Sequence, residues 1–256
     1  MTDHVRSEKS NGVLTLTMNR PEKKNALTRA MYQALADGID GAEHDADVRC
    51  VLIQAEGDTF TAGNDLSDFA AVNKGEPAAD QARSRGNPLL IALARARTPI
   101  VAAVNGRAVG IGTTMLLHCD LVFVSDEARL TTPFVNLALV PEAASSLLLP
   151  ARIGHARAFA MFVLGEAVDA KSAVEWGLAN AAVPAGELRA RARAAAEAVA
   201  ARPASATGIT KSLMRDPAAL AERMEIEGVH FAAQLKSAEA REAFAAFAEK
   251  RRTSNK

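Results

Sequence analysis

Residues 99–126 read PIVAAVNGRAVGIGTTMLLHCDLVFVSD, and this stretch decides the fold class. A β-branched apolar run leads through three glycines into a second apolar run that begins at about Asp120. The pattern predicts a buried strand, a glycine turn, a short helix from about Thr113 and another buried strand. Because strands alternate with helices, we expect an α/β fold with crossover connections.

The same alternation extends toward the amino terminus. Ser10-Asn11-Gly12 separates two apolar runs and predicts a hairpin within the first 20 residues. Thr28 is a good N-cap for a helix whose apolar side chains recur at helical spacing. Residues 48–55 predict a buried strand that exits through the loop DTFTAGNDL, and helices are expected over 65–71 and 81–96.

Beyond about Gly154 the chain changes to alanine-rich helical patterns. Helices are expected over 155–164, 170–176, 185–201, 203–214, 218–236 and 238–250. Pro203 disfavours helix at Arg202 and marks the best boundary. We therefore expect a core over residues 1–202 and a helical region over residues 203–256.

Composition excludes several classes of function. Thirty basic and thirty acidic residues balance, so neither nucleic acid nor a membrane surface is an expected partner. Cys50 and Cys119 both lie in apolar runs, which predicts core thiols rather than disulfides or metal ligands. The first residues lack a secretory pattern and no apolar run is long enough to span a bilayer. We expect a cytoplasmic protein without a metal.

Two glycine turns carry the first chemical signal. Gly106, Gly110 and Gly112 lie between an apolar run and a helix start, where backbone N–H groups can bind an anion or a developing oxyanion. The segment from Phe60 to Leu66 has the same character. If the fold brings the turns together, each could donate to a single carbonyl oxygen; otherwise they are a tight turn and an unrelated helix cap.

Glu142 carries the second signal, because it is the only charged residue in the 22 positions from Leu130 to Ala151. A lone carboxylate in apolar surroundings is suited to accept a proton. The alternative is that Glu142 only complements a helix N-terminus after Pro141. The histidines do not cluster as metal ligands or a triad, and the basic groups 23–24 and 250–252 could meet phosphates or simply be solvated.

Four motifs together resemble one family over essentially the whole chain. They are NRPEKKNALT (19–28), FTAGNDL (60–66), the run from 99 to 133 and AVEWGLAN (173–180). In this order and spacing they are similar to the crotonase, or enoyl-CoA hydratase/isomerase, superfamily. The resemblance implies a spiral of β-β-α turns, a C-terminal helical region that builds homotrimers or hexamers, acyl-CoA thioesters as ligands and no separate cofactor. It places the two oxyanion N–H donors on Asn64 and Ile111.

The departures from the family pattern point to one activity within it. Hydratases of the family carry two glutamates at positions that hold Thr114 and Phe134 here, so water activation lacks its usual groups. Glu142 instead resembles the single catalytic base in the N-L-G-x-x-P-E-G-x-S-S segment of peroxisomal-type Δ3,Δ2-enoyl-CoA isomerases, with Ala143 in place of a glycine. The resemblance therefore implies an enoyl-CoA isomerase.

The expected site combines these residues. Glu142, Asn64 and Ile111 are the catalytic candidates. Substrate contacts are expected from Lys24, Ala26, Leu27, Ala62, Gly63, Asp65, Leu66, Gly110, Thr114, Phe134, Lys211 and Lys250, the lysines near the phosphates of CoA. Two alternatives stay open: a hydratase or another lyase that recruits Asp65, Asp68 or Glu142 as its base, and a non-catalytic acyl-CoA-binding homologue.

Overall fold

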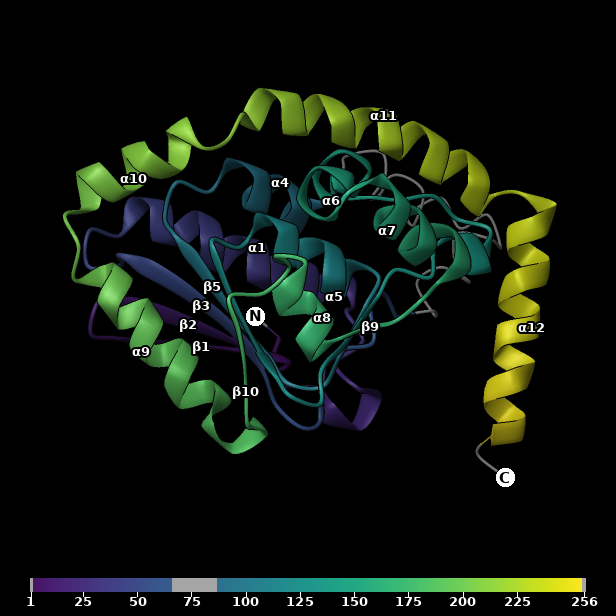
Figure 1. The fold of residues 1–256 in the computed structure, drawn as a ribbon, viewed down its shortest axis with the longest axis horizontal. Coiled ribbons are helices and arrows are strands. Elements are labelled where there is room, and N and C mark those ends of the chain that lie inside the picture. The colour runs from purple at the N-terminus through teal and green to yellow at the C-terminus, as the bar shows by residue number, and fades with distance from the viewer. Residues whose placement is uncertain (1, 66–86, 255–256) are drawn as a thin grey trace.

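The computed structural model describes residues 2–65 and 87–254, in which the strands form two sheets (Figure 1). The six-stranded sheet has the order β1-β2-β3-β5-β7-β10 and the four-stranded sheet has the order β4-β6-β8-β9. The first contains β1 (Val5–Ser10), β2 (Val13–Met18), β3 (Cys50–Ala55), β5 (Ile100–Val104), β7 (Leu121–Ser125) and β10 (Ala181–Val183). The second contains β4 (Thr59–Thr61), β6 (Arg107–Val109), β8 (Arg129–Thr131) and β9 (Val168–Asp169).

Consecutive strands alternate between the two sheets. β3, β5 and β7 lie in the six-stranded sheet, and each is followed at once by β4, β6 or β8 in the other sheet. β3 pairs with β5 and β5 with β7 in parallel, and the same holds for β4, β6 and β8. Each turn of the chain therefore adds one strand to each sheet, which confirms the α/β class and the expected β-β-α spiral.

Local signals explain how the spiral starts. Asn11 and Gly12 both have positive φ, 49° and 74°, and close the hairpin in which Ser10 faces Val13. The Thr28 side chain accepts the N–H of Met31 at 3.3 Å and caps α1 (Arg29–His44). The hairpin and the N-cap are confirmed.

Helices cover both faces of the six-stranded sheet. α1 packs with α4 (Pro88–Arg95), and its Leu35 and Ile39 join the main apolar cluster. α9 (Leu188–Ala200) packs on β3 and β5, and its alanines form a second cluster that includes Cys50. Both cysteines are free thiols, and burial raises the pKa of each to about 12, as core residues should show.

Apart from the three C-terminal helices, the other helical segments are short and lie between the strands or after them. They are η1 (Pro21–Lys23), α5 (Ile111–Thr114), η2 (Met115–His118), η3 (Val135–Leu137), α6 (Ser145–Ile153), α7 (His155–Phe159), η4 (Ala160–Leu164), α8 (Ala170–Glu175) and η5 (Ala185–Glu187). The helix expected over 155–164 is present as α7 followed by the π-helical η4. The sequence did not predict α6, because it contains Pro150.

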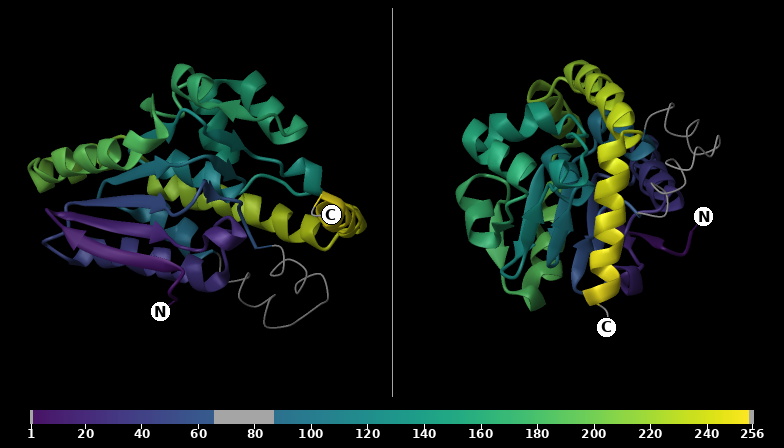
Figure 2. Two further views of the ribbon diagram at one scale, coloured as in Figure 1. Left: turned by 90° about the horizontal axis from the view of Figure 1, so that it is seen from below. Right: turned by 90° about the vertical axis from the view of Figure 1, so that its right-hand side faces the viewer.

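Three helices after Pro203 wrap around the spiral (Figure 1). They are α10 (Ala204–Leu213), α11 (Pro217–Leu235) and α12 (Ala238–Ser254), and two further views place α12 along one side of the molecule (Figure 2). α11 contacts α4 and α6, and its Phe231 and Leu235 are part of the main core. Leu213, Met214 and Val229 remain 83%, 80% and 71% exposed, so these helices also present apolar side chains outward.

Candidate functional site

Three sequence segments meet where the parallel strands β4, β6 and β8 end. β4 pairs with β6 and β6 with β8, so their carboxyl ends lie at one edge of the four-stranded sheet. The segments that follow are 62–65, 110–114 and 132–134. Parallel strand ends are a common place for ligand sites because the connecting loops converge there.

The first segment pairs with the loop before α1. The N–H of Leu27 donates to the Gly63 carbonyl at 2.8 Å, and the N–H of Asp65 donates to the Leu27 carbonyl at 3.0 Å. The N–H of Ala62 donates to the Lys24 carbonyl at 2.9 Å. The expected site residues Lys24, Ala26, Leu27, Ala62, Gly63, Asn64 and Asp65 therefore lie together.

Two further residues fix Asn64 and Asp65. The Tyr32 hydroxyl donates to Asn64 Oδ1 at 2.6 Å, and Arg20 forms an ion pair with Asp65 at 2.6 Å between side chains that are 15% and 18% exposed. Arg20 also donates to the Ala26 carbonyl at 3.1 Å. Sequence reasoning missed Tyr32 and Arg20, since neither residue type carries a local signal for a contact 32 or 45 residues away.

The second segment is the turn at Gly110. Gly110 has φ 56° and ψ −116°, a conformation that residues with a side chain avoid. Its carbonyl accepts the N–H groups of Thr113 and Thr114, so α5 begins at Ile111 rather than at the expected Thr113. The N–H of Ile111 stands at the first position of the helix, where no intrahelical acceptor exists.

Glycine is required where the two segments touch. A Cβ atom on Gly63 would lie 2.9 Å from the Val109 carbonyl oxygen, and one on Gly112 would lie 2.5 Å from Thr61 Cγ2. Such distances would force the Val109 backbone and the Thr61 side chain to shift. The turns that carry Asn64 and Ile111 are therefore direct neighbours, as donation to one shared carbonyl oxygen requires.

The loop that carries Glu142 is built from left-handed alanines. Ala138, Ala143 and Ala144 have φ of 53°, 66° and 53°, and Glu142 itself is partly buried. Ala138 and Ala143 stand at the glycine positions of the isomerase segment that this loop resembles. Left-handed backbone costs an alanine about 1 kcal/mol, which explains the glycines of the family pattern.

Glu227, rather than Glu142, supplies the carboxylate at the start of α6. Its two oxygens accept the N–H groups of Ala144 and Ser146 at 2.7 and 2.8 Å, while the N-cap residue Ala144 has no capping side chain. Burial raises the pKa of Glu227, and these N–H donors oppose that rise. Glu227 therefore supplies the charged acceptor at this helix N-terminus.

His118 contacts the same loop. Its ring is fully buried, and burial lowers its pKa to about 4, so the imidazole is neutral at pH 7. His118 Nε2 lies 2.8 Å from the Ala143 carbonyl oxygen and donates its hydrogen to it. No local sequence pattern connects His118 or Glu227 with this loop.

Two expected substrate contacts are buried side chains. Thr114 is fully buried on α5, and Phe134 is 5% exposed with its ring centroid 6.1 Å from that of Phe162. Neither side chain carries a carboxylate, so the two positions that hold glutamates in hydratases offer no acid or base here.

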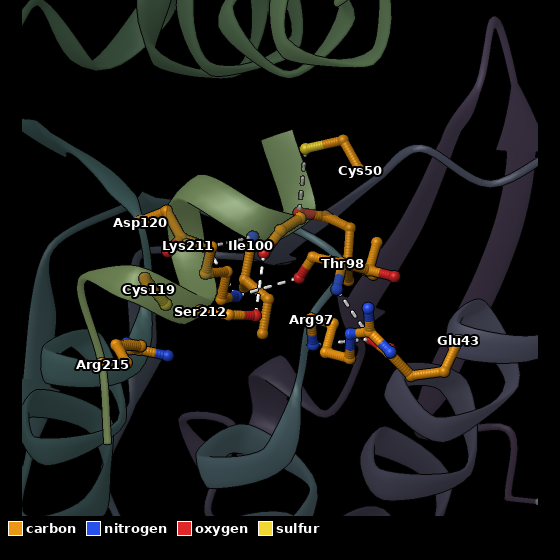
Figure 3. A network of polar contacts seen from close by, with 12 residues as sticks. Glu43, Cys50, Arg97, Thr98, Ile100, Cys119, Asp120, Lys211, Ser212 and Arg215 are labelled. Carbon is orange, nitrogen blue, oxygen red and sulfur yellow. Dashed lines mark hydrogen bonds and ion pairs between the residues drawn. The ribbon is translucent and has the colours of Figure 1, made fainter. Parts of the chain in front are cut away.

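Lys211 has a structural role that the sequence did not predict. Its ammonium group donates to Asp120 Oδ2 at 2.7 Å and to the Thr98 carbonyl at 2.9 Å, and the residue is only 6% exposed (Figure 3). Lys211 joins α10 to the spiral and is not an exposed phosphate ligand of this chain, which corrects that expectation.

Several expectations fall on other parts of the chain. Lys24 is exposed and pairs with Asp58 at 2.8 Å, so a phosphate could compete for it. Leu66 and Asp68 lie outside the described residues, and Lys250 is placed on α12 by its backbone alone.

Within residues 2–65 and 87–254, no three His, Cys, Asp or Glu side chains gather as a metal site. No helix of that part combines the length and apolarity that a bilayer span requires.

Comparisons with known proteins agree with this geometry. Residues 8–256 match the family model of enoyl-CoA hydratase/isomerase. A 1,2-epoxyphenylacetyl-CoA isomerase of Escherichia coli is 34% identical, covering 98% of this chain and 97% of that protein. An enoyl-CoA delta isomerase 2 of Rattus norvegicus is 35% identical over 80% of this chain and 52% of its own length.

Hydratases are similar to the chain as well. A probable enoyl-CoA hydratase of Rhodobacter capsulatus is 34% identical over 96% of this chain and 95% of that protein. The crystal structure of an enoyl-CoA hydratase/isomerase from Pseudoalteromonas atlantica superimposes with a TM-score of 0.89 at 45% identity, covering 97% and 98% of the two chains. The family match and these full-length similarities show that the chain belongs to the enoyl-CoA hydratase/isomerase family and has the crotonase fold.

Proposed function

We propose that the protein is an acyl-CoA isomerase that moves the double bond of a 3-enoyl-CoA to the 2-position. The observation that carries the proposal is the combination of two adjoining turns, at Asn64 and Ile111, with the partly buried carboxylate of Glu142. The similarity of this chain to two proteins that are named as acyl-CoA isomerases supports the same class of reaction.

The proposed reaction needs one base and one oxyanion site. Glu142 takes a proton from C2 of the thioester, and the electron pair of that C–H bond moves into the carbonyl group to form an enolate. The N–H groups of Asn64 and Ile111 hold the enolate oxygen, each contributing about 3 kcal/mol to the transition state. Glu142 then returns the proton to C4 as the double bond shifts into conjugation.

Coenzyme A is part of the proposed enoyl-CoA substrate, so the proposal includes no separate cofactor. We place its phosphates near Lys24, with Lys250 as a second candidate. The exposed apolar side chains of α10 and α11 support a homotrimer or hexamer, which light scattering would detect. The proposal includes a cytoplasmic location.

Replacement of the base tests the proposal. Glu142→Gln keeps the shape of the side chain and removes its basicity, so 3-enoyl-CoA turnover should fall by about 100-fold or more while the melting temperature stays within a few degrees. The exposed Glu127→Gln is the matched control and should behave as wild type. Near-wild-type rates in Glu142→Gln would refute the mechanism.

The wild-type substrate preference separates the remaining alternatives. Faster turnover of 2-enoyl-CoA than of 3-enoyl-CoA would assign the protein as a hydratase. Tight acyl-CoA binding with no turnover of either thioester would assign it as a binding homologue.

A further inference from the structure

A single buried carboxylate connects the C-terminal helices with the loop of the proposed base. Glu227 lies on α11 and is 6% exposed. Its Oε2 accepts the N–H of Ala144 at 2.7 Å and its Oε1 accepts the N–H of Ser146 at 2.8 Å. Both carboxylate oxygens are therefore used on two residues that follow Glu142 by two and four positions.

These bonds replace a cap that the local sequence does not provide. The N-terminal N–H groups of a helix need acceptors, and an alanine N-cap offers none from its side chain. A charged acceptor makes stronger hydrogen bonds than a neutral one and complements the positive end of α6. Removing it would leave buried N–H groups without partners.

The same short segment is also held by His118. The Ala143 carbonyl accepts from His118 Nε2 at 2.8 Å, next to the two N–H groups that Glu227 binds. Ala143 and Ala144 are both left-handed, and such backbone persists only where surrounding contacts determine it. The direction in which Glu142 leaves the chain therefore depends on these two contacts.

We infer that Glu227 is a positioning residue for Glu142, holding the base at the acyl chain from a helix of the C-terminal region. The inference rests on the proposed function, because it needs Glu142 to be the base. Glu227 does not touch the substrate and exchanges no proton in the reaction. Its role is to fix the backbone at residues 143–146 so that one carboxylate reaches both C2 and C4.

Glu227→Gln is the informative variant. Glutamine has the same size, but one of its two polar atoms is an NH₂ group, which cannot accept from a backbone N–H. The matched control is Glu225→Gln, because Glu225 is exposed on the same helix. Glu227→Asp, which keeps the charge at shorter reach, provides a second variant if the glutamine protein does not fold.

Two measurements are made on each full-length protein below its melting temperature. Steady-state isomerisation of a 3-enoyl-CoA should show kcat at least tenfold lower in Glu227→Gln, with KM within twofold of wild type. Amide hydrogen exchange should become faster at Ala144 and Ser146. Glu225→Gln should change neither quantity, and Glu227→Asp should show a smaller loss of kcat in the same direction.

Each outcome has a distinct meaning. A folded Glu227 variant with faster exchange but wild-type kcat would show a helix cap only and overturn the inference. Unchanged exchange at Ala144 and Ser146 would overturn it by showing that Glu227 does not hold the loop. Failure of the proposed function is seen separately, as a wild-type protein that does not isomerise 3-enoyl-CoA.

Discussion

Removing Asp120 should destabilise the protein more than removing its partner Lys211. The Lys211 side chain is 5% exposed and that of Asp120 is 28% exposed, with 2.7 Å between Nζ and Oδ2. Asp120→Asn leaves the buried ammonium group of Lys211 without its negative partner, facing only neutral acceptors such as the Thr98 carbonyl (Figure 3). Removing one partner of a buried ion pair lowers the free energy of unfolding by about 3–5 kcal/mol. Because Asp120 is partly exposed, we expect a loss near the lower end of this range, about 3 kcal/mol.

Lys211→Met should cost less, about 1–2 kcal/mol. Methionine keeps the apolar stem in place, and the Asp120 carboxylate retains the Ile100 N–H at 2.7 Å and access to water. The double variant removes both charges, so its loss should be about 2 kcal/mol smaller than the sum of the single losses. Urea unfolding at pH 7 and one fixed protomer concentration measures all four proteins.

Two results would refute this reasoning. If Asp120→Asn lowers the free energy of unfolding less than Lys211→Met does, then the unpaired ammonium group is not the more destabilising of the two charges. Strict additivity in the double variant would mean that the two groups do not interact in solution. The same proteins test function, because Lys211→Met should leave the KM for acyl-CoA within twofold of wild type, whereas a phosphate ligand would raise it about tenfold.

Three further predictions follow from the site. In Gly110→Ala the new Cβ has no atom within 4 Å, so the substitution acts only through the backbone torsion angles of residue 110. We expect about 1–3 kcal/mol of strain and, because the Ile111 N–H turns away, a kcat at least tenfold lower than that of wild type. The control Gly208→Ala should leave kcat unchanged. Because burial lowers the pKa of His118 from 6.5 to about 4, the unfolded chain takes up this proton first as the pH falls. Wild type should therefore lose about 3 kcal/mol of unfolding free energy between pH 6.5 and 4 that His118→Gln does not lose, as urea titrations at several pH values would show. Lys24→Ala should raise the KM for acyl-CoA several-fold with kcat unchanged, and an unchanged KM would remove Lys24 from the phosphate site.

Sequence patterns predicted those elements whose signal is local. The hairpin at Ser10-Asn11-Gly12 needs only turn chemistry, and the Thr28 cap needs only its own first turn. The strands β4, β6 and β8 have three residues each, which is too short for a periodicity of two to be recognised. α6 was missed because Pro150 normally ends a helix, and tertiary contacts from α11 stabilise it instead.

The candidate site likewise contains some residues that a local sequence signal indicates and others that no local signal indicates. Glycine spacing and the isolation of Glu142 singled out the two turns and the proposed base, and the family resemblance placed the proposed donors on Asn64 and Ile111. The residues that hold them, Tyr32, His118 and Glu227, act over 25 to 83 positions of sequence, and ordinary polar residues give no sign of such partners. Lys211 shows the reverse case, in which a basic residue suited to a phosphate is bound instead to a carboxylate inside the protein.

The alternation of strands between two sheets has an evolutionary consequence. Each turn of the spiral delivers one loop to the edge where β4, β6 and β8 end, so separate loops carry the turns at Asn64 and Ile111 and the Glu142 segment. Close glycine packing fixes the turns at Asn64 and Ile111, whereas the Glu142 segment lies in a loop of its own. A carboxylate in one loop can therefore be exchanged without rebuilding the turns at Asn64 and Ile111.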